Sequence, residues 1–297
     1  MTADVSELDR RLLNAVQRGV PLCPRPFDRL ASDLGVRPEA VLERIAAHLQ
    51  PEGLIREISG VFDAAALGCE TTLVAARVRP DRRDTAGEVV IGHPGVSHCY
   101  GRGGEMNLWF TLAVGPDSRL GLDRTLTVMR RLTRSERLVS LPAERRYKLH
   151  VHFDPASGSP AGRAAQGGPP PATTRRPPAD ERQVRAVRAL QTPLPAVREP
   201  FVEVVREAGL SREELLALAD DFLSRGWMRR YAAVLHHRRA GARHNCMVAW
   251  RVPPERADEF GEQAARLDAV SHCYRRRTAP DWPYNLYTMI HGRRAED

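Results

Sequence analysis

The chain repeats the pentapeptide Val96-Ser97-His98-Cys99-Tyr100 as Val270-Ser271-His272-Cys273-Tyr274, 174 positions later. The same offset relates Pro26-Phe27 to Pro200-Phe201. Self-similarity at a fixed spacing is the signature of a duplicated unit, and five identical residues in a row are unlike a chance match. We therefore predict that the 297 residues hold two copies of one unit.

Each copy begins with a pattern typical of a helix-turn-helix. In the first copy, apolar residues recur at helical spacing, and Gly35 is expected to end the second helix. The helices of the first copy are expected at residues 6–16, 27–34 and 38–49. Residues 54–62 are expected to form a wing hairpin, and the second copy repeats the whole pattern over 181–235.

The remainder of each copy predicts a mixed α/β domain. The first copy has strand and helix patterns in the ferredoxin-like βαββαβ order, expected at residues 71–78, 84–91, 96–101, 108–114, 118–131 and 146–153. The second copy predicts only the first four of these elements, expected at residues 245–252, 256–267, 270–275 and 285–290. Without a last strand, the edge of 245–252 is left unpaired, unless the sequence is truncated or a partner supplies the strand.

The fold class is therefore predicted as α+β, a tandem repeat of a winged helix-turn-helix and a ferredoxin-like domain, with the second ferredoxin-like domain incomplete. A stretch rich in Pro, Gly and Ala without acidic residues predicts a flexible linker between the copies. The predicted boundaries are 1–64 and 68–154 for the first copy, 155–179 for the linker, and 180–240 and 243–297 for the second copy.

The basic residues are almost all arginine, since Lys148 is the single lysine among 45 basic residues and the net charge is +8. An arginine-biased genome explains this, and so does an acidic ligand, because a guanidinium pairs with carboxylate or phosphate through two hydrogen bonds. Residues 222–254 hold seven Arg and three His but no Asp or Glu. A solvated face is one interpretation, but such a run favours an anion site.

DNA is the partner that a helix-turn-helix and a basic chain first suggest, because the third helix of such a motif enters the major groove. In the first copy, Arg44 and His48 on this helix are balanced by two glutamates. In the second copy, residues 211–223 carry four acidic residues against Arg212 alone. A net-negative helix repels phosphate, so we expect the helix-turn-helix to be a scaffold.

The repeated strands carry the most specific chemistry. Because side chains alternate along a strand, one face is expected to present a valine, a histidine, a tyrosine and an arginine. These residues are Val96, His98, Tyr100 and Arg102 in the first copy and Val270, His272, Tyr274 and Arg276 in the second. The three polar types offer a proton donor, a polar aromatic wall and a carboxylate clamp. An ordinary structural histidine is the alternative, which the repetition weakens.

Other site classes find little support in the sequence. The five cysteines are far apart with no CxxC pair, which predicts reduced thiols and no zinc ribbon. No phosphate loop, metalloprotease pair or nucleophile elbow is present. His150 and His152 alternate on a strand, but an exposed face is favoured over a metal site. The polar start and the lack of a long apolar run predict a cytoplasmic protein.

Three features together resemble the sirohaem decarboxylases, the feast/famine-like proteins of haem d1 and alternative haem biosynthesis. They are the wing Gly53-Leu54-Ile55-Arg56, the paired Val-Ser-His-Cys-Tyr strands, and the run Trp-Pro-Tyr-Asn-Leu-Tyr-Thr-Met-Ile-His-Gly at 282–292. The chain resembles the fused form with two subunit types joined head to tail, although its second copy lacks the final helix and strand. The resemblance implies oxygen-independent loss of CO2 from two acetate side chains of sirohaem, which gives 12,18-didecarboxysirohaem.

The resemblance also implies roles for individual residues. We expect His272 to act as a proton donor or iron-side ligand, His98 to be its counterpart, and Tyr100 and Tyr274 to be secondary donors. Flat aromatic side chains are expected to stack on the macrocycle, with an ordinary core as the alternative, and basic residues to clamp its carboxylates. The expected substrate-binding residues are Arg102, Trp109, Arg146, Lys148, Arg229, Arg230, Arg275, Arg276, Tyr284, Asn285 and Tyr287.

Beyond the iron tetrapyrrole itself, no cofactor and no separate metal site are expected. The expected partners are sirohaem and a second copy or related decarboxylase subunits, with neither DNA nor a membrane. The alternative function is a feast/famine-type DNA-binding transcriptional regulator that senses a small molecule, which the acidic third helix of the second copy disfavours.

Overall fold

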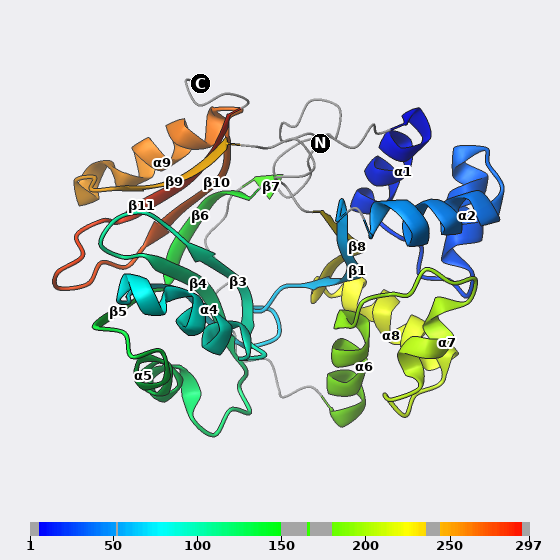
Figure 1. Cartoon of the computed structure of the whole chain (residues 1–297), viewed down its shortest axis with the longest axis horizontal. Coiled ribbons are helices and arrows are strands. Elements are labelled where there is room, and N and C mark those ends of the chain that lie inside the picture. The colour runs from blue at the N-terminus through cyan, green and yellow to red at the C-terminus, as the bar shows by residue number, and fades with distance from the viewer. Residues whose placement is uncertain (1–5, 52, 150–164, 167–179, 236–243, 293–297) are drawn as a thin grey trace.

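The computed structural model describes residues 6–51, 53–149, 165–166, 180–235 and 244–292. The helices are α1 (Glu7–Arg18), α2 (Pro26–Leu34), α3 (Pro38–Glu43, continued as a π-helical segment over Arg44–Leu49), α4 (Arg83–Ile91), α5 (Gly121–Thr133), α6 (Glu181–Gln191), α7 (Pro200–Val205), α8 (Arg212–Ser224) and α9 (Ala257–Arg266). The strands are β1 (Ile55–Phe62), β2 (Glu70–Arg77), β3 (Val96–Gly101), β4 (Leu108–Val114), β5 (Arg137–Leu141), β6 (Ala143–Leu149), β7 (Ala165–Gln166), β8 (Met228–Leu235), β9 (His244–Trp250), β10 (Val270–Arg276) and β11 (Leu286–Gly292). The helix-turn-helix elements form one lobe and two larger sheets form the other (Figure 1).

Both copies start their helix-turn-helix with the same local signals. Ser6 caps α1 and Asp180 caps α6, each in a reciprocal capping box that satisfies backbone N–H groups at the helix start. Gly35 follows α2 with a φ of 69°, and Gly209 adopts a φ of 60° at the matching turn. This left-handed conformation favours glycine. The predicted helix-turn-helix units are confirmed.

The expected wing hairpins are wrong, because each unit supplies one strand and the two strands pair with each other. β1 runs antiparallel to β8, with Ile55 opposite Leu235 and Phe62 opposite Met228. Phe27 and Phe201, at equivalent positions of α2 and α7, are both fully buried in one apolar core that the two units share. A single core joined by a shared ribbon makes the two units one lobe.

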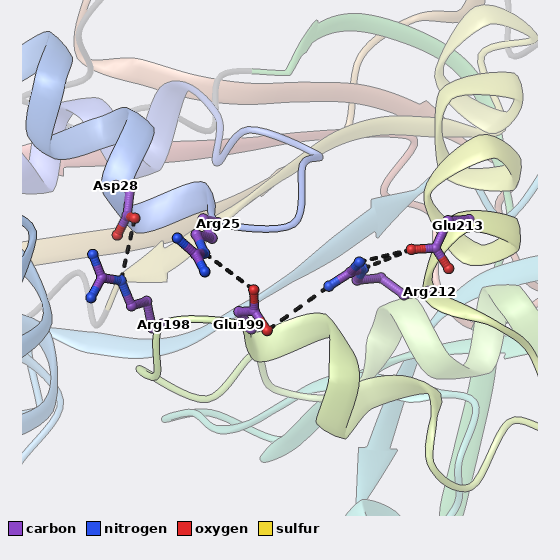
Figure 2. Close-up of polar contacts among 6 residues, drawn as sticks. All are labelled: Arg25, Asp28, Arg198, Glu199, Arg212 and Glu213. Atoms are coloured by element: carbon purple, nitrogen blue, oxygen red, sulfur yellow. Dashed lines mark hydrogen bonds and ion pairs between the residues drawn. The ribbon is translucent and has the colours of Figure 1, made fainter.

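Ion pairs connect the two units beside this core (Figure 2). Arg25 Nε lies 3.1 Å from Glu199 Oε1, and Arg198 Nε lies 3.4 Å from Asp28 Oδ2. Glu199 also faces Arg212 at 4.0 Å. These side chains are 24–55% exposed, so each pair contributes little to stability and mainly specifies how the units meet.

The first sheet confirms the ferredoxin-like fold but corrects its last strand. Its order is β3-β4-β2-β5, which is the expected arrangement with the fourth strand beside the first. The fourth strand is β5, however, whereas residues 146–153 were expected to fill this place. Leu141 of β5 lies opposite Leu73 of β2. Residues 150–153 lie outside the described part of the chain.

β6 crosses to the second sheet directly after β5 and lies beside β10. The order there is β7-β6-β10-β11-β9, so a strand of the first copy extends the sheet of the second. Tyr274 lies opposite Arg146 in this pairing. Among the described strands nothing pairs with the far side of β9, which is the edge expected for an incomplete domain.

The two sheets pack through their inner faces, while helices cover the outer ones. Val74 and Phe110 meet α4 and α5 on the outer side of the first sheet, and Cys273 and Leu286 meet α9 on the second. Between the sheets, Trp109 lies in one apolar cluster with residues of both copies. Figure 1 shows α5 and α9 on opposite outer sides of the sheet lobe.

The packing of α9 on β6 generates a stability prediction at Gly261. A Cβ atom at this position would lie 2.5 Å from the Tyr147 ring, whereas a Cβ at Gly87 in α4 would meet nothing within 4 Å. Gly87→Ala is expected to stabilise the protein by about 0.5–1 kcal/mol through helix propensity. Gly261→Ala is expected to destabilise it by about 1–3 kcal/mol through overpacking. Denaturant unfolding measures both, and equal stabilisation by the two substitutions would contradict the packing of β6 against α9.

Candidate functional site

A β-bulge interrupts the repeated strand at the same place in both copies. The pairing of β3 with β4 shifts register between Val96 and His98, and that of β10 with β11 shifts between Val270 and His272. Both valines therefore pack on the helix-covered side, next to Cys99 and Cys273, and not on the histidine face as alternation predicted. A bulge inserts one residue and re-aims its neighbours, and bulges are frequent beside active sites.

The bulged serine holds the histidine that follows it. In the first copy, the Ser97 hydroxyl lies 2.9 Å from His98 Nδ1 and 2.7 Å from the Thr111 hydroxyl. Dense surroundings, together with the charge of Arg56, lower the pKa of His98, although nearby Glu57 opposes this effect. His98 is thus predominantly neutral at neutral pH, and its Nδ1 is engaged by Ser97.

In the second copy the bulged serine meets a histidine, from a position two residues beyond the equivalent of Thr111. The Ser271 hydroxyl lies 2.7 Å from His272 Nδ1 and 2.7 Å from His291 Nε2. Burial lowers the pKa of His291. The Ser271 hydroxyl therefore holds the His272 ring through Nδ1, as Ser97 holds His98.

An arginine stacks on the tyrosine of each face. The Arg102 guanidinium carbon lies 5.1 Å from the Tyr100 ring centroid, and that of Arg276 lies 4.9 Å from the Tyr274 centroid. The backbone N–H groups of both arginines donate to an asparagine carbonyl of the next strand, which holds the two strand ends alike. Stacking leaves N–H donors of a guanidinium directed at the rim of the ring, where an anion can meet them.

Three strands bring positive charge to Tyr274. Its phenol lies in the field of Arg276 on β10, Arg146 on β6 and Arg229 on β8, with Asp63 the one opposing charge. Burial nevertheless raises the pKa of Tyr274, so the phenol stays protonated and can donate a hydrogen bond. Arg146 and Arg276 therefore lie beside Tyr274, and the charge of Arg229 from the other lobe also reaches the phenol.

The arginines of the shared ribbon also sit at bulges. Arg229 is skipped in the pairing of β8 with β1, and Arg56 is skipped at the other end of the ribbon. Each lies three residues after a glycine of positive φ, Gly53 at 68° and Gly226 at 69°. The two arginines are thus equivalents, and Arg56 acts on His98 as Arg229 acts on Tyr274. Arg230 stays in the ladder opposite Val61 and is half-buried.

Two expected carboxylate clamps lie elsewhere. Arg275 faces α9, where its Nη1 lies 2.7 Å from Asp258 Oδ1, on the side of β10 opposite to Tyr274. Lys148 is buried and donates to the Leu267 carbonyl at 2.8 Å, at the end of α9. Strand alternation explains the first correction, since Arg275 and Arg276 are neighbours. Both side chains hold α9 on its sheet.

The expected stacking residues belong to the core between the sheets. Trp109 and Tyr287 are buried, and Trp282 packs on the first and donates to the hydroxyl of the second at 2.7 Å. Tyr284 packs on Trp282 at 4.8 Å between ring centroids. Asn285 uses both ends of its amide on the backbone of Val252. In this structure these side chains contact one another and the backbone, so their expected contacts with a planar ligand stay a prediction.

Sequence reasoning missed four residues beside the two faces, namely Arg56, Asp63, Ser271 and His291. Ser271 and His291 lie within the repeated pentapeptide and the 282–292 run, so a signal was present. Arg56 lies in the wing motif, but no local signal reveals that the ribbon carries it to His98. Asp63 has no sequence signal at all, because its partner Arg229 is 166 residues away.

Other site types find no support in the described residues. No group of three His, Cys, Asp or Glu side chains suitable for a metal occurs among them, and all five cysteines are free thiols. His150 and His152 lie outside the described residues, as do His236, His237, Arg238, Arg239 and Arg243 of the acid-free stretch. None of the helices in the described part is long and apolar enough to cross a membrane.

Family models match both copies of the unit. The "Siroheme decarboxylase NirDL-like HTH domain" matches residues 9–56 and 184–229, and the "AsnC-like ligand binding domain" matches 66–148 and 239–297. A siroheme decarboxylase of Hydrogenobacter thermophilus is 35% identical over 292 residues, 98% of this chain and 85% of that protein. The siroheme decarboxylase alpha subunit of Desulfovibrio desulfuricans is 35% identical over 153 residues, 51% of this chain and 85% of that subunit.

A solved structure resembles the whole chain. The crystal structure of the siroheme decarboxylase NirDL in complex with an iron-uroporphyrin III analogue superposes with a TM-score of 0.67 and 30% sequence identity. The match covers 96% of this chain and 82% of that one. Near-complete coverage by a 35% identical relative, together with matches to both domain models, shows that the chain belongs to the sirohaem decarboxylase family.

Proposed function

We propose that this chain is a carboxy-lyase that removes CO2 from two acetate side chains of sirohaem to give 12,18-didecarboxysirohaem. The observation that carries the proposal is that Arg146 lies opposite Tyr274 and Arg276 stacks on its ring, while the charge of Arg229 also acts on the phenol. Sirohaem carries eight carboxylates, and guanidinium groups bind carboxylates through paired, charge-assisted hydrogen bonds. The family membership supports the reaction, and the charge arrangement supports the substrate.

The chemical step needs little from the protein beyond position and a proton. When the bond between the acetate methylene and its carboxyl carbon breaks, the electron pair stays next to a pyrrole, where the macrocycle delocalises it. A proton on the methylene carbon then completes a methyl group. We propose that His272, which Ser271 holds through Nδ1, delivers this proton, while Arg146 and Arg276 orient the leaving carboxylate.

We propose that the face on β10 is the productive one. It combines His272 and Tyr274 with Arg146 of a neighbouring strand that the face on β3 does not have, since β3 is the edge of its sheet in the described part of the chain. His98, Tyr100 and Arg102 form the equivalent face of the first copy, which we assign to a secondary role in binding. Trp109, Lys148, Arg275, Tyr284, Asn285 and Tyr287 are assigned to the support of the sheets.

The DNA-binding alternative gains nothing from the helix-turn-helix lobe. Arg44, on the third helix of the first copy, is directed to Asp9 of α1 at 3.5 Å. Both units share one core, so their third helices cannot separate without exposing it. We propose that the enzyme works in the cytoplasm with sirohaem as its iron-containing substrate and without a further cofactor. Names such as alpha and beta subunit among its relatives favour assembly with a second copy or related subunits.

His272→Ala is expected to reduce CO2 release by about 100-fold or more, because a positioned general acid contributes about that much. Sirohaem binding, followed by the shift of its Soret band, is expected to persist, and circular dichroism should show an intact fold. The assay is anaerobic incubation with sirohaem and mass spectrometry of the tetrapyrrole. His98→Ala is expected to lose less activity, and the reverse ranking of the two variants would move the productive face to β3.

Arg276→Gln is expected to weaken sirohaem binding about tenfold or more, since a charge-assisted hydrogen bond is lost. Arg275→Gln is the matched control, because it removes the same charge from the adjacent residue on the other side of β10. Its dissociation constant should stay within about twofold of the parent value. Titration of the Soret band measures both constants, and equal weakening by the two variants would contradict the assigned face.

A further inference from the structure

Asp63 is an acidic residue inside the arginine cluster, and its geometry is tightly specified. It follows β1 directly, and its Oδ1 accepts hydrogen bonds from the backbone N–H groups of Ala65 and Ala66 at 3.1 and 3.2 Å. Its own N–H donates to the Trp227 carbonyl at 2.8 Å, at the end of the shared ribbon. The carboxylate is therefore held by backbone N–H groups of the first copy, and the Asp63 backbone by a carbonyl of the second, before the carboxylate meets any side chain.

The other oxygen of Asp63 holds Arg229. Oδ2 lies 2.6 Å from Arg229 Nη2 and 3.3 Å from Nε. Within the described part of the chain Nη1 of Arg229 makes no hydrogen bond, so this nitrogen can donate one to a ligand. The Arg229 charge opposes the rise in the pKa of Tyr274 that burial causes, so the held guanidinium lies within electrostatic range of the face proposed for sirohaem.

The first copy pairs its equivalent arginine with an acid of the same strand. Arg56, the equivalent of Arg229, is paired at 2.6 Å with Glu57, the next residue of its own strand. In the second copy the acid comes from the other copy, 166 residues away. Arg146, which faces Tyr274 from β6, also belongs to the first copy. The face on β10 is thus composed of residues from both copies.

A carboxylate at this position has an electrostatic cost for a polyanionic substrate. The Asp63 side chain is only 16% exposed. Burial raises the pKa of Asp63. The hydrogen bond and charge of Arg229, together with the two backbone N–H groups, lower it by more, so the net pKa is lowered and the group stays ionised. A carboxylate that only lowered the positive charge of the site would weaken the attraction for sirohaem. A carboxylate that orients the Arg229 guanidinium improves the contact of that guanidinium with the carboxylates of sirohaem.

We propose that Asp63 is a positioning residue that acts through Arg229, holding its fork so that Nη1 meets a carboxylate of sirohaem. The inference rests on the proposed function and extends it, since the site of the second copy is completed by a side chain of the first. Because the held arginine binds substrate and transition state equally well, the loss of its position is expected to raise KM and to leave kcat unchanged.

The test is Asp63→Asn, which keeps an Oδ1 acceptor for Ala65 and Ala66 but replaces the oxygen that holds Arg229 by an N–H donor. KM and the Soret-derived dissociation constant of sirohaem are expected to rise about tenfold, with kcat within about twofold. Glu199→Gln is the matched control, because it also removes one negative charge and one ion pair between the copies, with Arg25 (Figure 2). It should leave both constants unchanged.

A second variant decides whether Asp63 acts through Arg229. In an Arg229→Ala background, Asp63→Asn is expected to have no further effect on KM, because the group that it positions is gone. Tighter sirohaem binding by Asp63→Asn alone, additive effects in the double variant, or a fall in kcat and thermal midpoint at constant KM would each overturn the proposal. If the unaltered protein neither binds nor decarboxylates sirohaem, the proposed function itself fails.

Discussion

The antiparallel pairing of β1 with β8 is the interaction on which the rest of the structure depends. Neither helix-turn-helix unit supplies a complete sheet, so each strand needs the other copy to satisfy its backbone groups. The pairing merges two small apolar cores into one and fixes where Arg56 and Arg229 emerge. It also sets Asp63 against the start of β8, 166 residues away in sequence from Arg229. The two copies therefore depend on each other structurally and are not two independent domains joined by a linker.

Much of this architecture could be predicted from local sequence. Apolar periodicity and the helix-ending Gly35 indicated both helix-turn-helix units, and alternation along the repeated strand grouped His272, Tyr274 and Arg276. The β1–β8 pairing could not be predicted, because its partners are separated by a whole copy and the strands resemble ordinary wing strands. The pairing of β6 with β10 could not be predicted either, because it depends on an unpaired edge of β10 in the other copy.

The bulges mark where sequence periodicity fails and the site begins. At Ser97 and Ser271 an extra residue turns a valine to the core and brings a hydroxyl to the histidine that follows. Alternation predicts an uninterrupted strand, so it misplaced the valines while it grouped the polar residues correctly. Aromatic residues were assigned to a planar ligand because flat side chains suit both a macrocycle and a core. The burial of Trp109 and Tyr287 favours the core for these two residues.

The most direct test of the account is a structure of this chain with sirohaem bound, determined without oxygen. In this complex, macrocycle carboxylates are expected within hydrogen-bonding distance of Arg146, Arg229 and Arg276, with the His272 ring next to an acetate side chain. Arg229 is expected to keep its contact with Asp63. A macrocycle bound against the face of β3 alone, or away from both repeated strands, would contradict the account.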